Sequence, residues 1–200
     1  NVICVGASEN VQSIGGTDGS GISDSGANSA DDIADFSSRG PCADGRQKPD
    51  LVAPGTHVSG GVFQAANPGA NGQADACFTG EGVSGGPSGN LFFPLGQQYF
   101  TASSGTSHST PAVAGGAALL RQYFINQGLP VPSPAMTKAF LVNSARYLTG
   151  TGANDNLWSP RQGMGGMDLG RTFDGVPRML RDQLPEDLFT SSGQMQIGRA

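Results

Sequence analysis

The chain has 200 residues, of which 32 are glycine and only 14% are charged, and its formal net charge is −5. This length is sufficient for one domain with a real hydrophobic core. Electrostatic binding to nucleic acid is disfavoured, because it needs clustered lysine and arginine. No apolar stretch reaches the length of a membrane span, and the apolar run that follows Asn1 is interpreted as a strand rather than as a signal peptide.

The first part of the chain predicts a buried strand followed by a long polar segment. Residues 2–7 are continuously apolar, as strands of parallel sheets are, and Cys4 is interpreted as a small buried residue within them. Residues 8–35 are polar and rich in glycine. Three aspartates near the end of this segment are interpreted as part of a solvated loop rather than as a metal site: Asp31, Asp32 and Asp35.

A second strand and a long loop follow. Residues 51–53 predict a short strand, which Pro54 and Gly55 close. Residues 58–98 repeat glycine, asparagine and proline with little periodicity, and this pattern predicts an elaborated loop. A loop of this length inside a compact domain is commonly functional or mobile.

The most informative local pattern begins at Gly105. Ser107 lies between small residues directly before a run, 112–120, that has no polar face, and a helix of that kind belongs in the centre of a domain. The helix is expected to end at Gly128, with Pro130 just beyond it. Ser107 is therefore predicted in the first turn of a buried helix. Free N–H groups and the positive end of the helix dipole there favour negative charge on a nearby oxygen.

The residues around Ser107 leave two interpretations open. Thr106 and Ser107 can simply cap the helix, as serine and threonine often do. Against this, Pro111 removes a helix hydrogen bond, and a helix strained beside an exposed serine points to function. Gly105 has no side chain and would allow another segment of the chain to approach closely.

The second half of the chain predicts another helix. Residues 134–148 form an amphipathic pattern that would pack on the outside of the sheet. Because strands alternate with helices, the sequence predicts an α/β domain with a mainly parallel sheet.

Several motifs carry a family resemblance. The pattern Gly-Thr-Ser-x-x-x-Pro-x-Val-Ala-Gly at residues 105–115 resembles the nucleophile motif of the subtilisin-like serine peptidases, the subtilases of peptidase family S8. Other segments are similar to that family, in family order: residues 1–7, 36–41, 44–55, 138–145 and 162–169.

This resemblance implies the subtilisin-like three-layer α/β fold with a mainly parallel sheet. Residues 1–170 would be an incomplete, C-terminal portion of the catalytic domain. Within it, the elaborated loop at 58–98 would form a rim of the substrate cleft. Residues 171–200 do not resemble the peptidase domain and are expected to begin a following segment or domain.

A serine nucleophile needs a base and a group that orients the base, and the chain has two histidines. His108 follows Ser107 directly, and neighbours on a helix point about 100° apart, so His108 cannot easily reach the hydroxyl. No histidine follows His108, which excludes the Ser-Asp-His order of α/β-hydrolases.

His57 stands in a Gly-Thr-His-Val-Ser-Gly sequence that mimics the family's base motif, and Asp24 begins an Asp-Ser-Gly that mimics its acid motif. We nevertheless reject the triad Asp24/His57/Ser107. His57 directly follows residues 48–55, which resemble a segment that comes long after the catalytic histidine in the family.

By resemblance, the parent protein is a serine endopeptidase that hydrolyses peptide bonds through an acyl-enzyme on Ser107. The aspartate, the histidine and the oxyanion asparagine are expected upstream of residue 1. The Ser107 N–H would be one oxyanion donor and Thr106 would brace the asparagine, while Ser103, Ser104 and Gly105 would border the cleft. The chain by itself would be nearly inactive, since loss of the base removes most of the turnover.

The resemblance also implies ligands, partners and location. No cofactor is required, but a structural calcium in the full-length protein is implied, and the acid at the position of Asp50 contributes to a weak cation site in some family members. The expected partners are protein or peptide substrates and the missing N-terminal part of the same domain, with neither nucleic acid nor membrane. The expected location is extracellular or in the cell envelope. That setting, together with loop-like sequence around both residues, motivates a disulfide between Cys42 and Cys77.

Two alternatives stay open. One is a non-catalytic subtilase-like binding domain, and the other is a sedolisin-type peptidase that uses acidic residues in place of histidine. The upstream sequence would distinguish them, because each requires a different residue in the place of the base.

Overall fold

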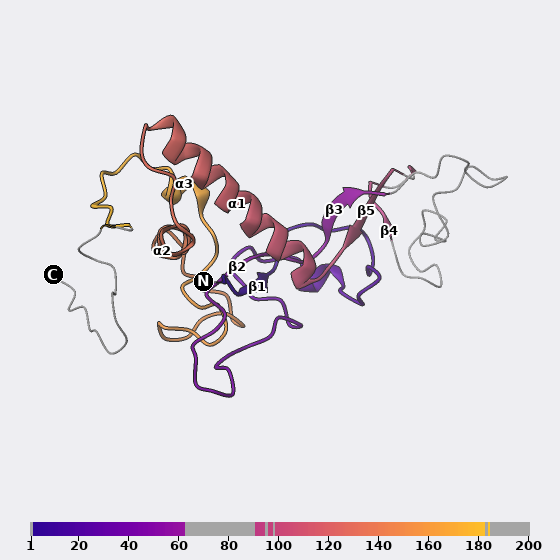
Figure 1. Ribbon diagram of the computed structural model, residues 1–200. Coiled ribbons are helices and arrows are strands. Elements are labelled where there is room, and N and C mark those ends of the chain that lie inside the picture. Colours follow the sequence, from indigo (N-terminus) through magenta and orange to yellow (C-terminus); the bar gives the residue numbers. More distant parts are fainter. Residues whose placement is uncertain (1, 63–90, 95, 98, 183, 185–200) are drawn as a thin grey trace.

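A computed structural model of the chain describes residues 2–62, 91–94, 96–97, 99–182 and 184 (Figure 1). The elements in chain order are β1 (Val5–Ser8), the 3₁₀ turn η1 (Asp24–Gly26), β2 (Leu51–Pro54), β3 (Val58–Gly61), β4 (Leu91–Phe92), β5 (Phe100–Ser103), α1 (Thr106–Asn126), α2 (Pro134–Asn143) and α3 (Leu169–Thr172). Within the described residues, no helix is both long and apolar enough to cross a bilayer.

Strands β1 and β2 form a parallel pair. Their register runs from Val5 opposite Leu51 to Ser8 opposite Pro54. The long helix α1 crosses close to this pair, and α2 lies beside the far end of α1 (Figure 1). The α/β class expected from the sequence is thus confirmed, because two parallel strands and their covering helices share one core.

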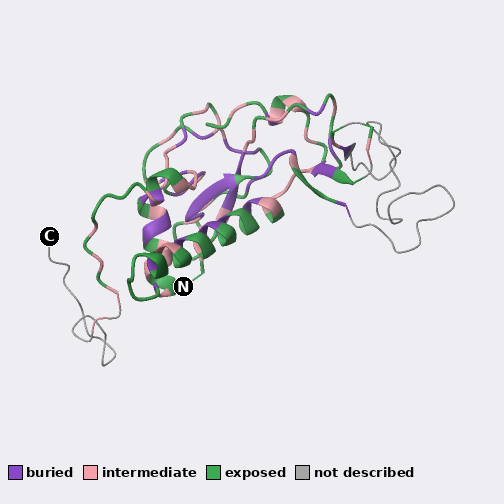
Figure 2. Cartoon of the chain, turned by 90° about the horizontal axis from the view of Figure 1, so that it is seen from above, coloured by how far each residue is buried: buried purple, intermediate pink, exposed green. Residues whose placement is uncertain are grey.

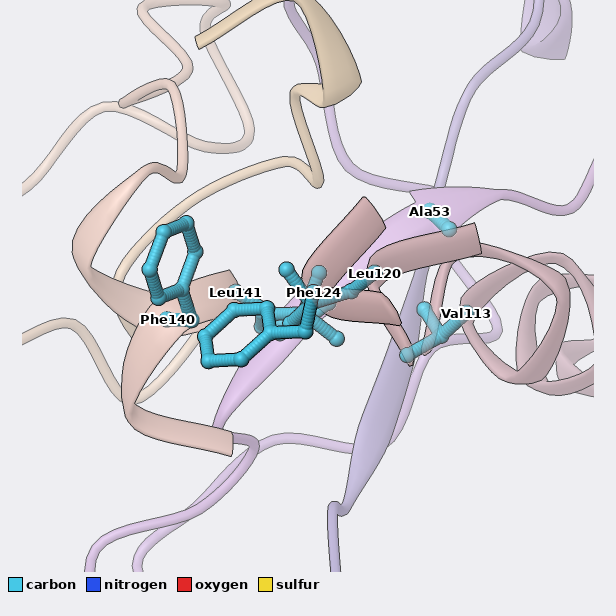
Figure 3. Packing of buried hydrophobic residues seen from close by; sticks show 7 residues of the cluster. Ala53, Val113, Leu120, Phe124, Phe140 and Leu141 are labelled. Carbon is cyan, nitrogen blue, oxygen red and sulfur yellow. The ribbon is translucent and has the colours of Figure 1, made fainter. Parts of the chain in front are cut away.

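The core lies between β2 and the two longer helices. Apolar side chains from all three elements meet there (Figure 3): Leu51, Ala53, Val113, Leu120, Phe124, Phe140 and Leu141. The rings of Phe124 and Phe140 meet edge to face, with centroids 5.5 Å apart. Full burial of each large side chain stabilises the fold by roughly 1.5–3 kcal/mol.

Helix α1 begins and ends close to the predicted positions, but the prediction that it is buried on all sides is wrong. Its buried residues recur on one face: Ser109, Val113, Gly116, Leu120 and Phe124. The outer side is exposed along the helix (Figure 2), where Leu119 is 53% exposed and Ile125 is 47% exposed. A helix whose sequence is apolar on all sides can be buried on every face, but the sequence does not require it. In the described part of the chain one face of α1 is covered.

The first strand begins later than predicted. It runs over Val5–Ser8 rather than over residues 2–7, so Cys4 lies before it and is exposed instead of buried. The backbone N–H of Cys4 donates a hydrogen bond to the Asp50 carboxylate at 2.7 Å.

The prediction of a continuous loop over residues 58–98 is wrong at both ends. Strand β3 pairs antiparallel with β5, and β4 pairs antiparallel with the other edge of β5. Strand β3 is difficult to predict from strand propensity, because it contains Gly60 and Gly61 and glycine is depleted in strands. The middle of the segment, residues 63–90, lies outside the described residues.

The second helix is shorter than the predicted range of 134–148. Its beginning follows the expected signals, since Pro134 follows Ser133 and the Ser133 hydroxyl accepts a hydrogen bond from the N–H of Met136 at 3.1 Å. It ends at Asn143. The hydroxyl of Ser144 then donates to the Phe140 carbonyl at 3.0 Å, a local side-chain bond that competes with continuation of the helix.

Asp31, Asp32 and Asp35 lie in a loop, as predicted, and Asp31 and Asp35 are exposed, but Asp31 also connects two segments. Asp31 forms an ion pair with Arg146, and its carbonyl accepts from the N–H of Gly150 at 2.7 Å. These contacts attach the polar segment to the chain that follows α2. Within the described residues, no group of three or more possible metal ligands is present.

Residues 173–182 pack back on the helices. Phe173 lies with its ring centroid 5.2 Å from that of Tyr123, and the Arg178 guanidinium lies 5.0 Å from the ring centroid of Phe140. Asp182 accepts hydrogen bonds from the backbone and hydroxyl of Ser133, at 2.7 and 2.6 Å. The described part of this segment is therefore attached to the same core, and the domain boundary at 170 stays a prediction.

Candidate active site

The end of β2 meets the beginning of α1. The N–H of Gly105 donates to the carbonyl of Gly55 at 2.7 Å, and the N–H of Gly55 donates to the carbonyl of Ser8 at 2.9 Å. A side chain at position 55 would place its Cβ 2.7 Å from the Cβ of Ala7 and against the hydroxyl of Ser109. Only glycine fits there without a shift of the helix.

The close approach that the sequence predicts at Gly105 thus depends on Gly55 instead. A Cβ at Gly105 would meet no atom closer than 3.7 Å. Glycine is needed at 105 for its backbone, because its φ of 155° is a conformation that other residues rarely adopt.

Ser107 is the second residue of α1 and is exposed. The helix is preceded by Gly105, and no side chain caps it, so the interpretation of Thr106 and Ser107 as simple caps is wrong. The first N–H groups of an α-helix have no partner within the helix, and they mark the positive end of its dipole. The Ser107 hydroxyl forms no hydrogen bond with any residue in the described ranges.

Pro111 lies inside α1, as predicted. It has no N–H, so it cannot donate to the carbonyl four residues earlier, which belongs to Ser107. The backbone of Ser107 is therefore less constrained by the helix than that of an ordinary first-turn residue.

His108 is directed to the neighbouring strand. Its Nε2 atom lies 2.7 Å from the hydroxyl of Ser103, at the end of β5. This contact agrees with the expectation that His108 does not serve Ser107. It also fixes the beginning of α1 against β5.

Ser104 connects three segments. Its hydroxyl donates a hydrogen bond to the carboxylate of Asp18 and accepts one from the N–H of His57 at 2.9 Å. Asp18 is only 3% exposed and also accepts from the hydroxyl of Ser20 at 2.6 Å. Ser104 is thus held from two sides immediately before the turn that leads to Ser107.

His57 is fully buried and is not positioned as a base. Its Nδ1 lies 2.8 Å from the carbonyl oxygen of Gln12, and its Nε2 lies 2.9 Å from that of Ile22. Asp24 is close, with 3.7 Å between its Oδ1 and the Nδ1 of His57. Asp24 and His57 therefore come together as their motifs suggest. Both ring nitrogens are nevertheless engaged, which leaves neither to accept a proton from Ser107.

Asp50, the residue that the resemblance suggests as a cation ligand, is in contact with two lysines. Its carboxylate binds Lys138 at 2.7 Å and Lys48 at 2.8 Å. Burial opposes ionisation of Asp50, but the Cys4 N–H and the two ammonium groups outweigh it and hold the pKa of this carboxyl below its ordinary value. A cation at Asp50 would have to displace both lysines.

The sequence predicts that residues 103–107 lie together, and they form one continuous stretch from the last residue of β5 to the first turn of α1. Sequence reasoning missed Asp18 and the two carbonyls that bind His57. Asp18 stands in the turn Thr-Asp-Gly-Ser-Gly, which is an ordinary polar turn by sequence. Asp18 has a role because it binds Ser104, which is far away in the sequence, and a local sequence pattern does not predict such a contact.

A disulfide between Cys42 and Cys77 stays a prediction, because Cys77 lies outside the described residues.

Comparison with known proteins gives one family. The model of the Subtilase family, Peptidase_S8, matches residues 1–165. The serine protease AprX of Bacillus subtilis is 38% identical over 118 residues, which cover 58% of this chain and 22% of that protein. The serine protease/ABC transporter B family protein tagD of Dictyostelium discoideum is 33% identical over 129 residues, or 60% of this chain and 6% of that protein.

Solved structures also resemble the chain. The CspB protease of Clostridium perfringens is 23% identical with a TM-score of 0.49, over 86% of this chain and 26% of that structure. The chain thus spans about a quarter or less of the relatives named here.

Proposed function

This chain belongs to the subtilase family of serine peptidases, and on that premise we propose that it supplies the nucleophile Ser107 to an endopeptidase. One observation carries the proposal. An exposed serine hydroxyl stands at the start of α1, beside helix N–H groups without intrahelical partners, inside the segment that the family model matches.

The proposed reaction is acyl transfer. The Ser107 oxygen attacks the carbonyl carbon of the scissile peptide bond while its proton passes to a base, and the resulting oxyanion is stabilised by N–H donors. Collapse of this intermediate expels the amine with a proton and leaves an ester on Ser107, which water then hydrolyses. The N–H of Ser107 is proposed as one oxyanion donor, with Thr106 bracing the second donor.

In this proposal the base comes from outside the described residues. His57 and His108 are both engaged elsewhere. We therefore propose that an aspartate, a histidine and an oxyanion asparagine precede Asn1 in the complete protein. Protein or peptide substrates, an extracellular or cell-envelope location and a structural calcium in the complete protein belong to the same proposal.

The test is hydrolysis of a fluorogenic peptide library by the full-length protein and by Ser107→Ala. We expect a burst of the amine product followed by slower turnover in the wild type, and loss of about 10⁶-fold of the turnover in Ser107→Ala. Thr110→Ala, an exposed change one turn further along α1, should keep its activity. Equal turnover in the wild type and in Ser107→Ala would refute the proposal.

A further inference from the structure

A buried carboxylate binds the link between strand β5 and helix α1, residues 104–105. Asp18 is only 3% exposed. Its carboxylate accepts hydrogen bonds from the N–H of Ser20 at 3.0 Å, the hydroxyl of Ser20 at 2.6 Å and the N–H of Ile22 at 3.2 Å. A further donor is the hydroxyl of Ser104, 86 residues away in the sequence. Because a buried carboxylate is stable only when such donors replace its water, Asp18 is held in a fixed place.

The hydrogen bonds at Ser104 have a fixed direction. The backbone N–H of His57 can only donate, and it donates to the Ser104 oxygen at 2.9 Å. The Ser104 hydroxyl donates its one hydrogen to Asp18, and a carboxylate can only accept. Both partners are buried, since His57 is 0% exposed and Asp18 is 3% exposed. The Ser104 side chain is therefore held between two buried groups from different parts of the chain.

The link matters for the site because it leads into the first turn of α1, where Ser107 lies. Gly105 can adopt many backbone conformations, so its own torsions do not fix the link. Its N–H binds the chain just after β2, and the hydroxyl of Ser103 contacts His108 across the link at 2.7 Å. The contact of Ser104 adds a third restraint, from the chain before β2.

We propose that Asp18 is a positioning residue: its carboxylate holds the Ser104 hydroxyl and thereby sets the place of the Ser107 oxygen. Asp18 acts through Ser104 and takes no part in the chemistry. Rates are sensitive to such placement, since a shift of about 1 Å can cost about 10²-fold. The inference rests on the proposed function, because the placement of Ser107 affects a rate only when Ser107 is the reacting group.

Two substitutions break the contact in different ways. Asp18→Asn keeps the shape of the side chain, but the donors of Ser20 and Ile22 compete for its single carbonyl oxygen. Its NH₂ group then faces the Ser104 oxygen, and the hydrogen of Ser104 loses its acceptor. Ser104→Ala removes the hydroxyl and leaves the turn that holds Asp18 intact.

The first measurement is the reaction of the full-length protein with a fluorophosphonate. The amplitude counts the folded, reactive protein and the rate constant reports the placement of the serine, so partial misfolding lowers only the amplitude. We expect the rate constant to fall about tenfold in Asp18→Asn and in Ser104→Ala, as loss of one charged hydrogen bond implies. Glu9→Gln is the matched control and should react at the wild-type rate, because Glu9 binds the N–H groups of Asn28 and Ser29.

The double variant Asp18→Asn/Ser104→Ala separates positioning from a general loss of structure. If Asp18 acts through Ser104, the double variant should react as slowly as each single variant, about tenfold below the wild type. Independent effects would multiply to about 10²-fold. That result would overturn the proposal.

A fluorogenic peptide substrate gives a second readout. In Asp18→Asn, kcat should fall about tenfold while KM stays within about twofold, because Asp18 places the nucleophile and does not bind the substrate. A raised KM with unchanged kcat, or a wild-type rate constant with the fluorophosphonate, would overturn the positioning role and leave the proposed function standing. A wild type that does not react with the fluorophosphonate would refute the proposed function, and the positioning role with it.

Discussion

The N–H of Gly105 donates a hydrogen bond of 2.7 Å to the carbonyl of Gly55, and this bond joins the nucleophile turn to the end of a core strand. The strand itself is anchored, since Leu51, Val52 and Ala53 are almost completely buried. This hydrogen bond is therefore one of the contacts that place Ser107 relative to the parallel pair β1–β2.

Gly55→Ala is expected to disturb this contact. The added methyl group would meet the Cβ of Ala7 at 2.7 Å and the hydroxyl of Ser109, so α1 must shift. Overpacking of this kind costs about 1–3 kcal/mol, and we expect a corresponding loss of unfolding free energy in thermal or denaturant unfolding, together with slower labelling of Ser107. Gly60→Ala is the control, because a methyl group at Gly60 meets no atom within 4 Å. Equal stability of the two variants would contradict this packing.

Asp50→Asn is expected to destabilise the fold by about 3 kcal/mol near neutral pH. The change leaves two ammonium groups, those of Lys48 and Lys138, beside a neutral amide in a largely buried place. Asp44→Asn is the matched control. Its partner Arg46 is solvent-exposed, as Asp44 is, and we expect no measurable loss of stability.

The contribution of Asp50 to the stability of the fold is also expected to depend on pH. Because the pKa of Asp50 is lowered in the folded protein, its contribution to stability is present above the unfolded pKa of about 4 and is lost as the pH falls through the folded value. The difference in unfolding free energy between the wild type and Asp50→Asn should be constant above about pH 5 and should shrink below about pH 4. A difference that grows in acid would show that the sign is wrong.

Gln162→Leu tests a buried amide in the part of the chain that follows α2. Gln162 is 0% exposed, accepts from the N–H of Leu148 at 2.7 Å, and donates to the carbonyls of Leu148 at 2.9 Å and Ala153 at 3.0 Å. Leucine fills similar space but leaves these backbone groups unpaired, which costs about 1–3 kcal/mol for each buried group. We expect a lower midpoint in urea. Gln122→Leu, at an exposed position of α1, should leave the midpoint nearly unchanged.

The sequence was most informative where local chemistry determines structure. The short strand at 51–53, the first-turn place of Ser107, Pro111 inside the helix and the end of α1 near Gly128 all follow from apolar runs, proline and glycine. These signals act within one element, so a single sequence is sufficient to read them.

The parts that could not be predicted depend on contacts between distant segments. Strand β3 contains two glycines and exists because β5 pairs with it. Helix α2 ends early because Ser144 bonds to a helix carbonyl and to the hydroxyl of Thr172. His57 resembles a catalytic base in sequence, but its ring partners come from a segment 35 and 45 residues earlier.

The central claim is that Ser107 is the nucleophile of a peptidase whose base lies outside this chain. The most direct measurement is mass spectrometry of the full-length protein after reaction with a fluorophosphonate. We expect one adduct, located on Ser107, that is absent in Ser107→Ala and when residues upstream of Asn1 are removed. An adduct on another residue, or undiminished labelling of Ser107→Ala, would contradict the account.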